Sequence, residues 1–243
     1  MSEKTTIGLV QINNSFSGQN YLPYSVGLIQ AYSMENARNP ESLHFLPPIY
    51  SRCSVLEAVT HLASADIVGF SVYVWNIRLS LAIAYALKLN RPDILIVLGG
   101  PQVPDHAEAF LREHPFIDLV CHGEGEQVFC SVIDGNSRKE WEGIPAVSYI
   151  SEKGKFETHS RGGRVKDLEL YPSPYLNNVF HQVMANNPNE KWLALWETNR
   201  GCPFACTFCD WGSAVASKVF KFDLGRLRRE VEWFATHNIE FIF

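Results

Sequence analysis

The sequence lacks the segments that would direct a chain into or across a membrane. No apolar run is long enough to cross a bilayer, and the polar start from Met1 to Thr6 runs straight into a strand-like segment without a signal-peptide core. Internal repeats and low-complexity tracts are also missing. Because 46% of the 243 residues are hydrophobic, the chain can bury a core of one large domain, or of one domain plus part of another. We expect a folded cytosolic protein that contacts no membrane.

A long basic stripe is absent as well. The net charge of −5 arises from interspersed charges, and no cluster of Lys and Arg is interleaved with aromatic residues. A nucleic-acid surface needs such a cluster. The composition therefore gives no reason to expect a nucleic-acid partner.

The cysteines do not have the spacing of a disulfide framework. Of six cysteines, Cys202, Cys206 and Cys209 fall within eight residues, whereas Cys53, Cys121 and Cys130 lie singly in apolar segments. This distribution is typical of one metal site plus buried thiols, and it indicates a reducing compartment.

Short apolar strands alternate with helical segments over roughly the first 135 residues. Parallel neighbouring strands need a crossover between them, so this alternation predicts an α/β fold with a doubly wound parallel sheet. The predicted strands cover 7–12, 43–49, 66–74, 94–98 and 117–121, and the predicted helices cover 22–37, 55–63, 77–89, 104–113 and a segment that begins after Gly123.

The pattern changes after this alternation. Residues 147–150 and 155–159 predict a hairpin, and the Gly- and Pro-containing stretch 161–190 predicts a linker with one short helix. A second unit begins near Trp192 with a strand over 193–197, an amphipathic helix and a strand over 240–243, as at the opening of an α/β barrel. We expect domains at 1–140 and 191–243 joined by 141–190, and a chain truncated within its barrel.

The segment Cys202-Pro-Phe-Ala-Cys206-Thr-Phe-Cys209 places three thiols on one compact loop. Three thiolates reach three corners of a cubane, and no fourth cysteine lies nearby, so one iron of a [4Fe–4S] cluster stays open for another ligand. The alternatives are a structural zinc site completed by Asp210 or a distant histidine, or three unligated cysteines. Structural zinc sites more often use paired two-residue spacings, and no second pair exists here.

The loop resembles the signature of the radical-SAM superfamily. The segment ETNRGCPFACTFCDWG follows a predicted strand and contains CxxxCxΦC with the aromatic Phe208. The resemblance implies that S-adenosylmethionine chelates the open iron, and that one electron from an external donor cleaves it to a 5′-deoxyadenosyl radical. It also implies that Phe208 lies beside the adenine, with ordinary packing as the alternative.

Three loops of the first domain are candidates for a ligand site. An open parallel sheet binds ligands outside the carboxyl ends of its strands, and here those ends carry residues 71–76, 99–102 and 123–126. Glycines in these loops let a bulky ligand approach the backbone, and the helix start after Gly123 presents free N–H groups. Glycines that only serve turns are the alternative.

Together, DIVGFSVYVWN, VLGGPQVP and HGEGEQVF resemble the Rossmann-like cobalamin-binding domain of cobalamin-dependent radical-SAM enzymes, and YLPYSVGLIQAY is similar to the segment before them. The resemblance implies that the dimethylbenzimidazole tail enters near Gly99 and Gly100, that the Glu124/Glu126 loop contacts the nucleotide, and that 73–76 faces the corrin. The implied cofactor-binding residues are Tyr73, Trp75, Asn76, Gly99, Gly100, Pro101, Gln102, Gly123, Glu124, Gly125 and Glu126.

The sequence departs from the family pattern in two places. It has no DxHxxG motif, so the histidine that ligates cobalt in methionine-synthase-like domains is missing, as is common in the radical-SAM branch. Gln102 also stands where a histidine often follows Gly-Gly-Pro. His106 and His122 lie near the predicted pocket, and ordinary loop or surface positions are the alternative to a ligand role for either.

These features predict an enzyme that uses cobalamin, S-adenosylmethionine and a [4Fe–4S] cluster, namely a methyltransferase acting on an unactivated carbon. The alternatives are a non-methylating cobalamin-dependent radical enzyme that catalyses cyclisation or rearrangement, and a zinc-stabilised α/β binding protein without catalysis. The substrate class stays open among peptide, polyketide, amino acid and lipid.

Overall fold

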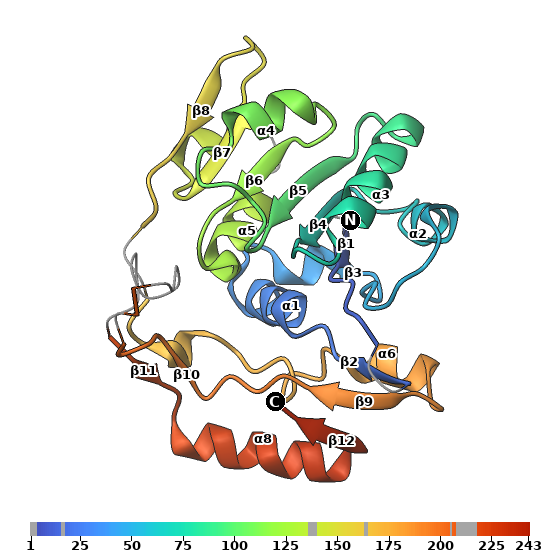
Figure 1. Cartoon of the computed structure of the whole chain (residues 1–243), viewed down its shortest axis with the longest axis vertical. Helices are drawn as coiled ribbons and strands as arrows, with labels where there is room; N and C mark the ends of the chain where they lie inside the picture. Colours follow the sequence, from blue (N-terminus) through green and yellow to red (C-terminus); the bar gives the residue numbers. More distant parts are fainter. Residues whose placement is uncertain (1–3, 16–17, 136–139, 163–164, 205, 208–217) are drawn as a thin grey trace.

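The computed structural model describes residues 4–15, 18–135, 140–162, 165–204, 206–207 and 218–243. Its largest element is a seven-stranded sheet, called the large sheet here, with the order β3-β1-β4-β5-β6-β7-β8 (Figure 1). Its strands are β1 (Thr5–Val10), β3 (Leu43–Phe45), β4 (Ile67–Ser71), β5 (Leu95–Gly99), β6 (Leu119–Cys121), β7 (Val147–Ile150) and β8 (Phe156–Thr158). The first five of these strands are parallel, which confirms the predicted α/β fold class.

Helices cover both faces of the large sheet (Figure 1). One face packs against α1 (Tyr24–Asn36) and α5 (Gly125–Asp134), and the other against α2 (Val55–His61), α3 (Ile77–Asn90) and α4 (Glu108–Glu113). The short 3-10 helices η1 (Pro40–Ser42) and η2 (Trp141–Gly143) lie in the connections. This two-sided covering defines a doubly wound sheet.

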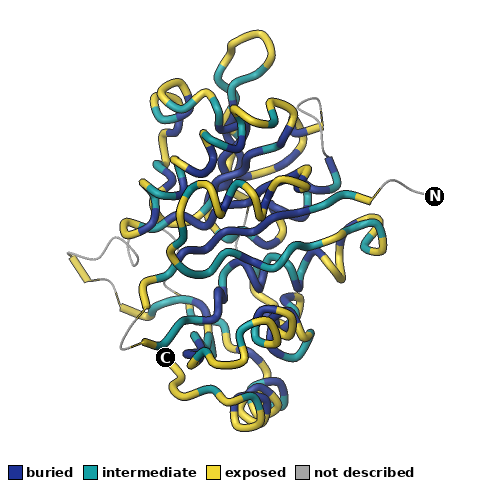
Figure 2. Tube along the Cα trace, turned by 90° about the vertical axis from the view of Figure 1, so that its right-hand side faces the viewer, coloured by how far each residue is buried: buried dark blue, intermediate teal, exposed yellow. Residues whose placement is uncertain are grey.

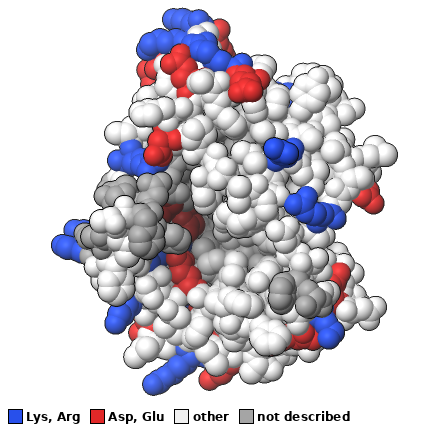
Figure 3. Space-filling model, in the orientation of Figure 1, with Lys and Arg blue, Asp and Glu red and all other residues white. Residues whose placement is uncertain are grey.

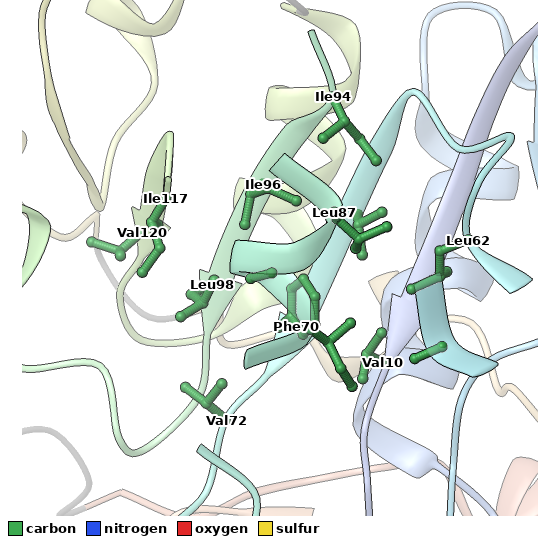
Figure 4. Packing of buried hydrophobic residues seen from close by; sticks show 14 of the residues in the cluster. Val10, Leu62, Phe70, Val72, Leu87, Ile94, Ile96, Leu98, Ile117 and Val120 are labelled. Atoms are coloured by element: carbon green, nitrogen blue, oxygen red, sulfur yellow. The ribbon is translucent and has the colours of Figure 1, made fainter. Parts of the chain in front are cut away.

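Apolar side chains from the strands fill the space under the helices. Figure 4 shows Val10, Phe70 and Leu98 from three neighbouring strands meeting Leu62 of the α2 end and Leu87 of α3. Because both faces of these strands are covered, buried residues follow one another along them, and Figure 2 shows such continuous buried stretches in dark blue.

Local sequence signals set where two helices begin. The Ser54 side chain accepts a hydrogen bond from the Glu57 backbone N–H, and the Glu57 carboxylate accepts from the Ser54 N–H, which forms a capping box before α2. Before α8 (Leu224–Thr236), the Asp223 carboxylate accepts from the Arg226 N–H. Each cap satisfies a backbone donor that the helix leaves open.

The second strand ends earlier than the sequence predicts. We expected a strand over 43–49, but β3 stops at Phe45 because Pro47 and Pro48 have no N–H to donate to the ladder. Pairing with β1 resumes at Ile49, whose N–H donates to the Leu9 carbonyl at 3.0 Å. The edge therefore stays ordered beyond the prolines.

The predicted hairpin joins the large sheet. β7 pairs antiparallel with β6, and β8 pairs antiparallel with β7. The stretch 161–190 was predicted as a linker with one short helix. Its described residues contain the 3-10 helix η3 (Leu168–Leu170) and the short helix α6 (His181–Asn186), and they bury the rings of Tyr171, Tyr175 and Phe180 completely or nearly so.

A second, smaller sheet lies on the other side of α1. This small sheet has the order β12-β9-β2, with β2 (Gln19–Tyr21), β9 (Lys191–Ala194) and β12 (Ile239–Ile242) all parallel. The strand predicted over 193–197 corresponds to β9, which begins earlier, at Lys191, because Lys191 pairs with Gln19. Helix α8 connects to β12, and the two-stranded ladder of β10 (Asn199–Arg200) and β11 (Phe220–Lys221) stands apart.

Helix α1 packs against two units, the large sheet with its helices on one side and the small sheet with α6 and α8 on the other. Val26 faces the large sheet, whereas Tyr24 and Leu28 join a core with Tyr175 and Trp233. Apolar residues of α1 therefore face two cores, while its last turn, Met34 to Asn36, is exposed. Gly27 permits this contact, because a Cβ there would come within 2.4 Å of the Phe180 ring. None of the described helices has both the length and the apolarity that a membrane span requires.

The turn after β5 brings two backbone segments unusually close. Gly100 has φ +104°, and a Cβ built on it would lie 2.7 Å from the Val72 carbonyl oxygen and 2.9 Å from the Val72 nitrogen. The neighbouring Gly99 has more space, since its Cβ would meet only Cys121, with a nearest distance of 3.7 Å. Gly100 is therefore required by the fold itself.

We predict that Gly100→Ala lowers the free energy of unfolding by about 2–4 kcal/mol, because the side chain meets backbone atoms and the left-handed φ is strained. Gly99→Ala is the matched control and should change stability by no more than about 1 kcal/mol. Urea unfolding monitored by circular dichroism measures both variants. Equal stabilities for the two variants would contradict this account of the turn.

Two buried cysteines should resist alkylation. Burial raises the pKa of Cys121 to about 12, and burial together with Asp134 raises that of Cys130 to about 11, whereas Cys206 is exposed. Because the thiolate is the reactive form, iodoacetamide at pH near the ordinary thiol pKa of about 8.5 should label Cys206 first. Mass spectrometry of the native and urea-unfolded chain gives the order of labelling, and equal rates in the native chain would contradict it.

Candidate functional site

A cavity of about 1070 Å³ opens at the carboxyl edge of the large sheet and extends to the segment after β9. Figure 3 shows the hollow in the middle of this face, with acidic side chains on its wall. Eight of the residues expected at the cofactor lie on the cavity wall, namely Tyr73, Gly99, Gly100, Pro101, Gly123, Glu124, Gly125 and Glu126. The three loops selected from the sequence thus meet at one cavity.

The loop after β4 is held rigidly. The buried Asn76 side chain accepts from the Tyr73 N–H at 2.8 Å and donates to the carbonyls of Ile12 and Ser71 at 3.0 and 3.1 Å. The Tyr73 and Trp75 rings stack with centroids 4.7 Å apart, and the Tyr73 hydroxyl lies 2.9 Å from the Ser25 hydroxyl. Asn76 therefore positions the loop, while Tyr73 faces the cavity.

The other residues expected here fall into two groups. His122 is buried on the cavity wall, with Nε2 2.9 Å from the Ser148 hydroxyl, so it is no surface histidine. Burial, the largest influence, lowers the pKa of His122 and favours the neutral ring. Gln102 and His106 are exposed and do not line the cavity, and neither does Trp75.

The cysteine loop begins beside the cavity. Gly201 lines the cavity with φ +115°, Cys202 follows it half-buried, and Cys206 is exposed. Cys209 and Phe208 lie outside the described residues, so the predicted three-thiolate set stays a prediction. Among the described residues, no group of three or more His, Cys, Asp and Glu side chains is placed to hold a metal.

A charge cluster with a buried centre joins the large-sheet unit to the small-sheet unit at this cavity. This junction cluster consists of Arg200, Glu124, Glu126, Glu197 and Tyr171. The Arg200 guanidinium donates to Glu126 through Nη2 and to Glu197 through Nε at 3.0 Å, and its Nη1 lies 3.7 Å from Glu124. Its carbon lies 4.4 Å from the centroid of the Tyr171 ring, whose hydroxyl donates to Glu124 at 3.1 Å.

Burial makes these contacts strong. The Arg200 and Glu126 side chains are each only 7% exposed. Burial raises the pKa of Glu197 against the opposing effect of Arg200, and burial followed by Glu126 and Glu124 raises that of Tyr171. For Arg200, burial lowers the pKa, but Glu126 and Glu197 outweigh it and the pKa rises, so the guanidinium stays charged. Removing one partner of such a buried pair typically costs about 3–5 kcal/mol.

The sequence analysis did not identify Arg200, Glu197 or Tyr171 as site residues. They lie on two segments, one with Tyr171 and one with Glu197 and Arg200, which only the fold brings to the start of α5, and a single arginine before Gly-Cys carries no spacing signal. Only the acidic pair Glu124 and Glu126 was predicted to lie at the site, as a nucleotide contact, and in the structure Glu126 accepts a hydrogen bond from Arg200. Whether the loop also contacts a nucleotide stays a prediction.

Known proteins match both parts of the chain. Residues 6–133 match the family described as "B12 binding domain", which is more than half of the chain. The "Cobalamin-dependent radical SAM methyltransferase TokK" of Streptomyces tokunonensis is 36% identical over 227 residues, covering 92% of this chain and 33% of that protein. The "2-(S-pantetheinyl)-carbapenam-3-carboxylate methyltransferase" of Streptantibioticus cattleyicolor is 36% identical over 232 residues, with the same two coverages.

The fold also matches a solved structure. The cobalamin-dependent S-adenosylmethionine radical enzyme OxsB, solved with aqua-cobalamin and S-adenosylmethionine bound, aligns with a TM-score of 0.72 at 20% identity, over 98% of this chain and 33% of OxsB. This likeness confirms the fold. The chain spans about a third of the length of the curated relatives that it matches. From the match over 6–133, the chain belongs to the B12-binding domain family.

Proposed function

We propose that this chain is the cobalamin-binding and cluster-binding part of a cobalamin-dependent radical-SAM methyltransferase. The observation that carries the proposal is the position of one cavity, which has the glycine-containing edge of a B12-binding sheet on one side and the start of the cysteine loop on the other. A corrin and an iron–sulfur cluster bound there face each other. The two methyltransferase relatives support the reaction class.

The cavity fits a corrin cofactor. Its volume of about 1070 Å³ lies just above the range for small-molecule sites, roughly 300–1,000 Å³, as a large ligand requires. Gly99 and Gly123 leave the wall free of side chains, since a Cβ at Gly123 would meet only the Arg161 side chain, at 4.0 Å. We assign the tail of the cofactor to the Gly99–Gly100 side and the corrin face to the Tyr73 loop.

The cysteine loop fits a [4Fe–4S] cluster through the chemistry of its donors. We assign Cys202, Cys206 and Cys209 as the three thiolate ligands, with the fourth iron left for S-adenosylmethionine and Phe208 beside its adenine. Cys202 and Cys206 are free thiols, and Cys206 is accessible to incoming iron. No other described cysteine lies on this loop.

When bound, these cofactors supply the radical and the methyl group, and the chain's own residues position them. Asn76 holds the Tyr73 loop, Gly100 lets the next loop pack beneath it, and Gly201 turns the backbone into the cysteine loop. An external one-electron donor, a small-molecule or peptide substrate and a cytosolic location complete the proposal.

Anaerobic reconstitution with iron, sulfide and hydroxocobalamin tests the two assignments together. The wild-type chain should bind one corrin and a sulfide-containing iron cluster with brown absorption. Cys206→Ala should lose the cluster and retain the corrin, because the corrin loops lie on a separate part of the chain. Quantification of iron, sulfide, zinc and corrin in both proteins measures the result.

A colourless zinc-loaded protein without corrin would overturn the proposal and support a zinc-stabilised binding protein. Loss of both cofactors in Cys206→Ala, with the secondary structure intact, would contradict the assignment of two separate sites. Cys53→Ala is the matched control, since Cys53 lies far along the chain from the loop and is itself a free thiol.

A second test addresses the corrin site alone. Gly99→Val should weaken hydroxocobalamin binding, because its methyl groups occupy cavity space. Overpacking of this kind costs about 1–3 kcal/mol, which corresponds to roughly 5–150-fold in affinity. Cluster content should match the wild type, because the cysteine loop is untouched. Binding titrations followed by absorbance measure the affinity, and an unchanged affinity would place the corrin elsewhere.

A further inference from the structure

We propose that Arg200 is a positioning residue that holds the cysteine loop against the start of α5, and so sets where the cluster lies relative to the corrin site. This inference rests on the proposed function. It assigns the junction cluster a role in the geometry between two cofactors, beyond stabilising the fold.

The partners of Arg200 come from both sides of the junction. Glu124 is the N-cap residue of α5 and Glu126 lies in its first turn, so both belong to the B12-binding region. Arg200 ends β10, and Glu197 lies between β9 and β10. The Arg200–Glu126 contact joins residues 74 positions apart and is buried. A single side chain therefore connects the corrin-side helix to the strand that leads into the cysteines.

The negative charge of three glutamates holds the Arg200 guanidinium in place. Glu124, Glu126 and Glu197 surround one guanidinium, so the junction cluster needs the positive charge of Arg200 to offset the repulsion among the three glutamates. Arginine suits the position because its planar fork donates in several directions at once, and its face covers the Tyr171 ring. A lysine presents a point charge and cannot satisfy the same set.

The link from this side chain to the cysteines is short. Only Gly201, at φ +115°, separates Arg200 from Cys202, and the Arg200 backbone pairs with Phe220 in the two-residue β10–β11 ladder. A shift of Arg200 therefore moves the first cluster ligand. Within the described part of the chain, the buried Arg200 Nη1 has no hydrogen-bond partner, and it contacts the Glu124 carboxylate at 3.7 Å as an ion pair.

The test uses the 243-residue chain loaded with iron, sulfide and hydroxocobalamin and reduced anaerobically with dithionite. Cob(II)alamin and the reduced cluster each carry an unpaired spin, so electron paramagnetic resonance reports their magnetic interaction. The variants are Arg200→Gln, Arg200→Lys and Glu126→Gln. Lys88→Gln is the control, because Lys88 bonds Asp118 at 2.7 Å within the large-sheet unit, away from the junction.

The wild type and Lys88→Gln should show the same magnetic interaction between cob(II)alamin and the reduced iron–sulfur cluster, with one value in each protein. Glu126→Gln and Arg200→Gln should retain both cofactors at wild-type stoichiometry while the interaction is lost or spread over several values, because the loop takes several positions. Arg200→Lys should be intermediate, because it keeps the charge without the fork. A purely structural role would lower stability and leave the interaction of the folded fraction unchanged.

An unchanged interaction in Glu126→Gln and Arg200→Lys would overturn the inference and leave the proposed function standing. If Arg200→Gln does not fold, the isosteric Glu126→Gln decides the question alone. If the wild-type chain binds either cofactor but not both, the proposed function fails and the inference is overturned with it.

Discussion

The site depends on one constraint, which is that five neighbouring strands of the large sheet run in the same direction. Parallel strands place all their carboxyl ends at one edge, and the order β3-β1-β4-β5-β6 reverses at β1, where successive crossovers leave on opposite faces. The loops after β4, β5 and β6 therefore meet although they are separated by whole helices in the sequence. The cavity is a consequence of this topology, and the side chains on the loops decide what it accepts.

The second determinant is the way in which the two units are joined. Helix α1 is apolar on both sides and packs into the cores of both sheets, while β2, which precedes it, pairs with β9 in the small sheet. The junction cluster adds a polar contact at the cavity wall. The apolar contacts of α1 stabilise the association of the two units, and the directional contacts of Arg200 fix the position of one unit relative to the other at the cavity wall.

The doubly wound sheet and the three cavity loops could be predicted from the sequence, because buried parallel strands and glycine-rich strand ends have strong local patterns. The sequence was insufficient for β2, a three-residue strand whose partner lies 172 positions away, as in the pairing of Gln19 with Lys191. It also did not reveal the role of Arg200 or the packing of Tyr171 and Tyr175 in a Pro-containing segment. Those features arise from long-range contacts, for which a single sequence has no periodic signal.

The central claim is that the cavity at the carboxyl edge is where the corrin binds. Amide hydrogen exchange with and without hydroxocobalamin tests it most directly, since bound ligand slows exchange where it orders the backbone. The account predicts slower exchange at 72–76, 99–102 and 123–126, with no change at the turn 151–155 between β7 and β8. Protection confined to the small sheet, or absent from all three loops, would contradict it.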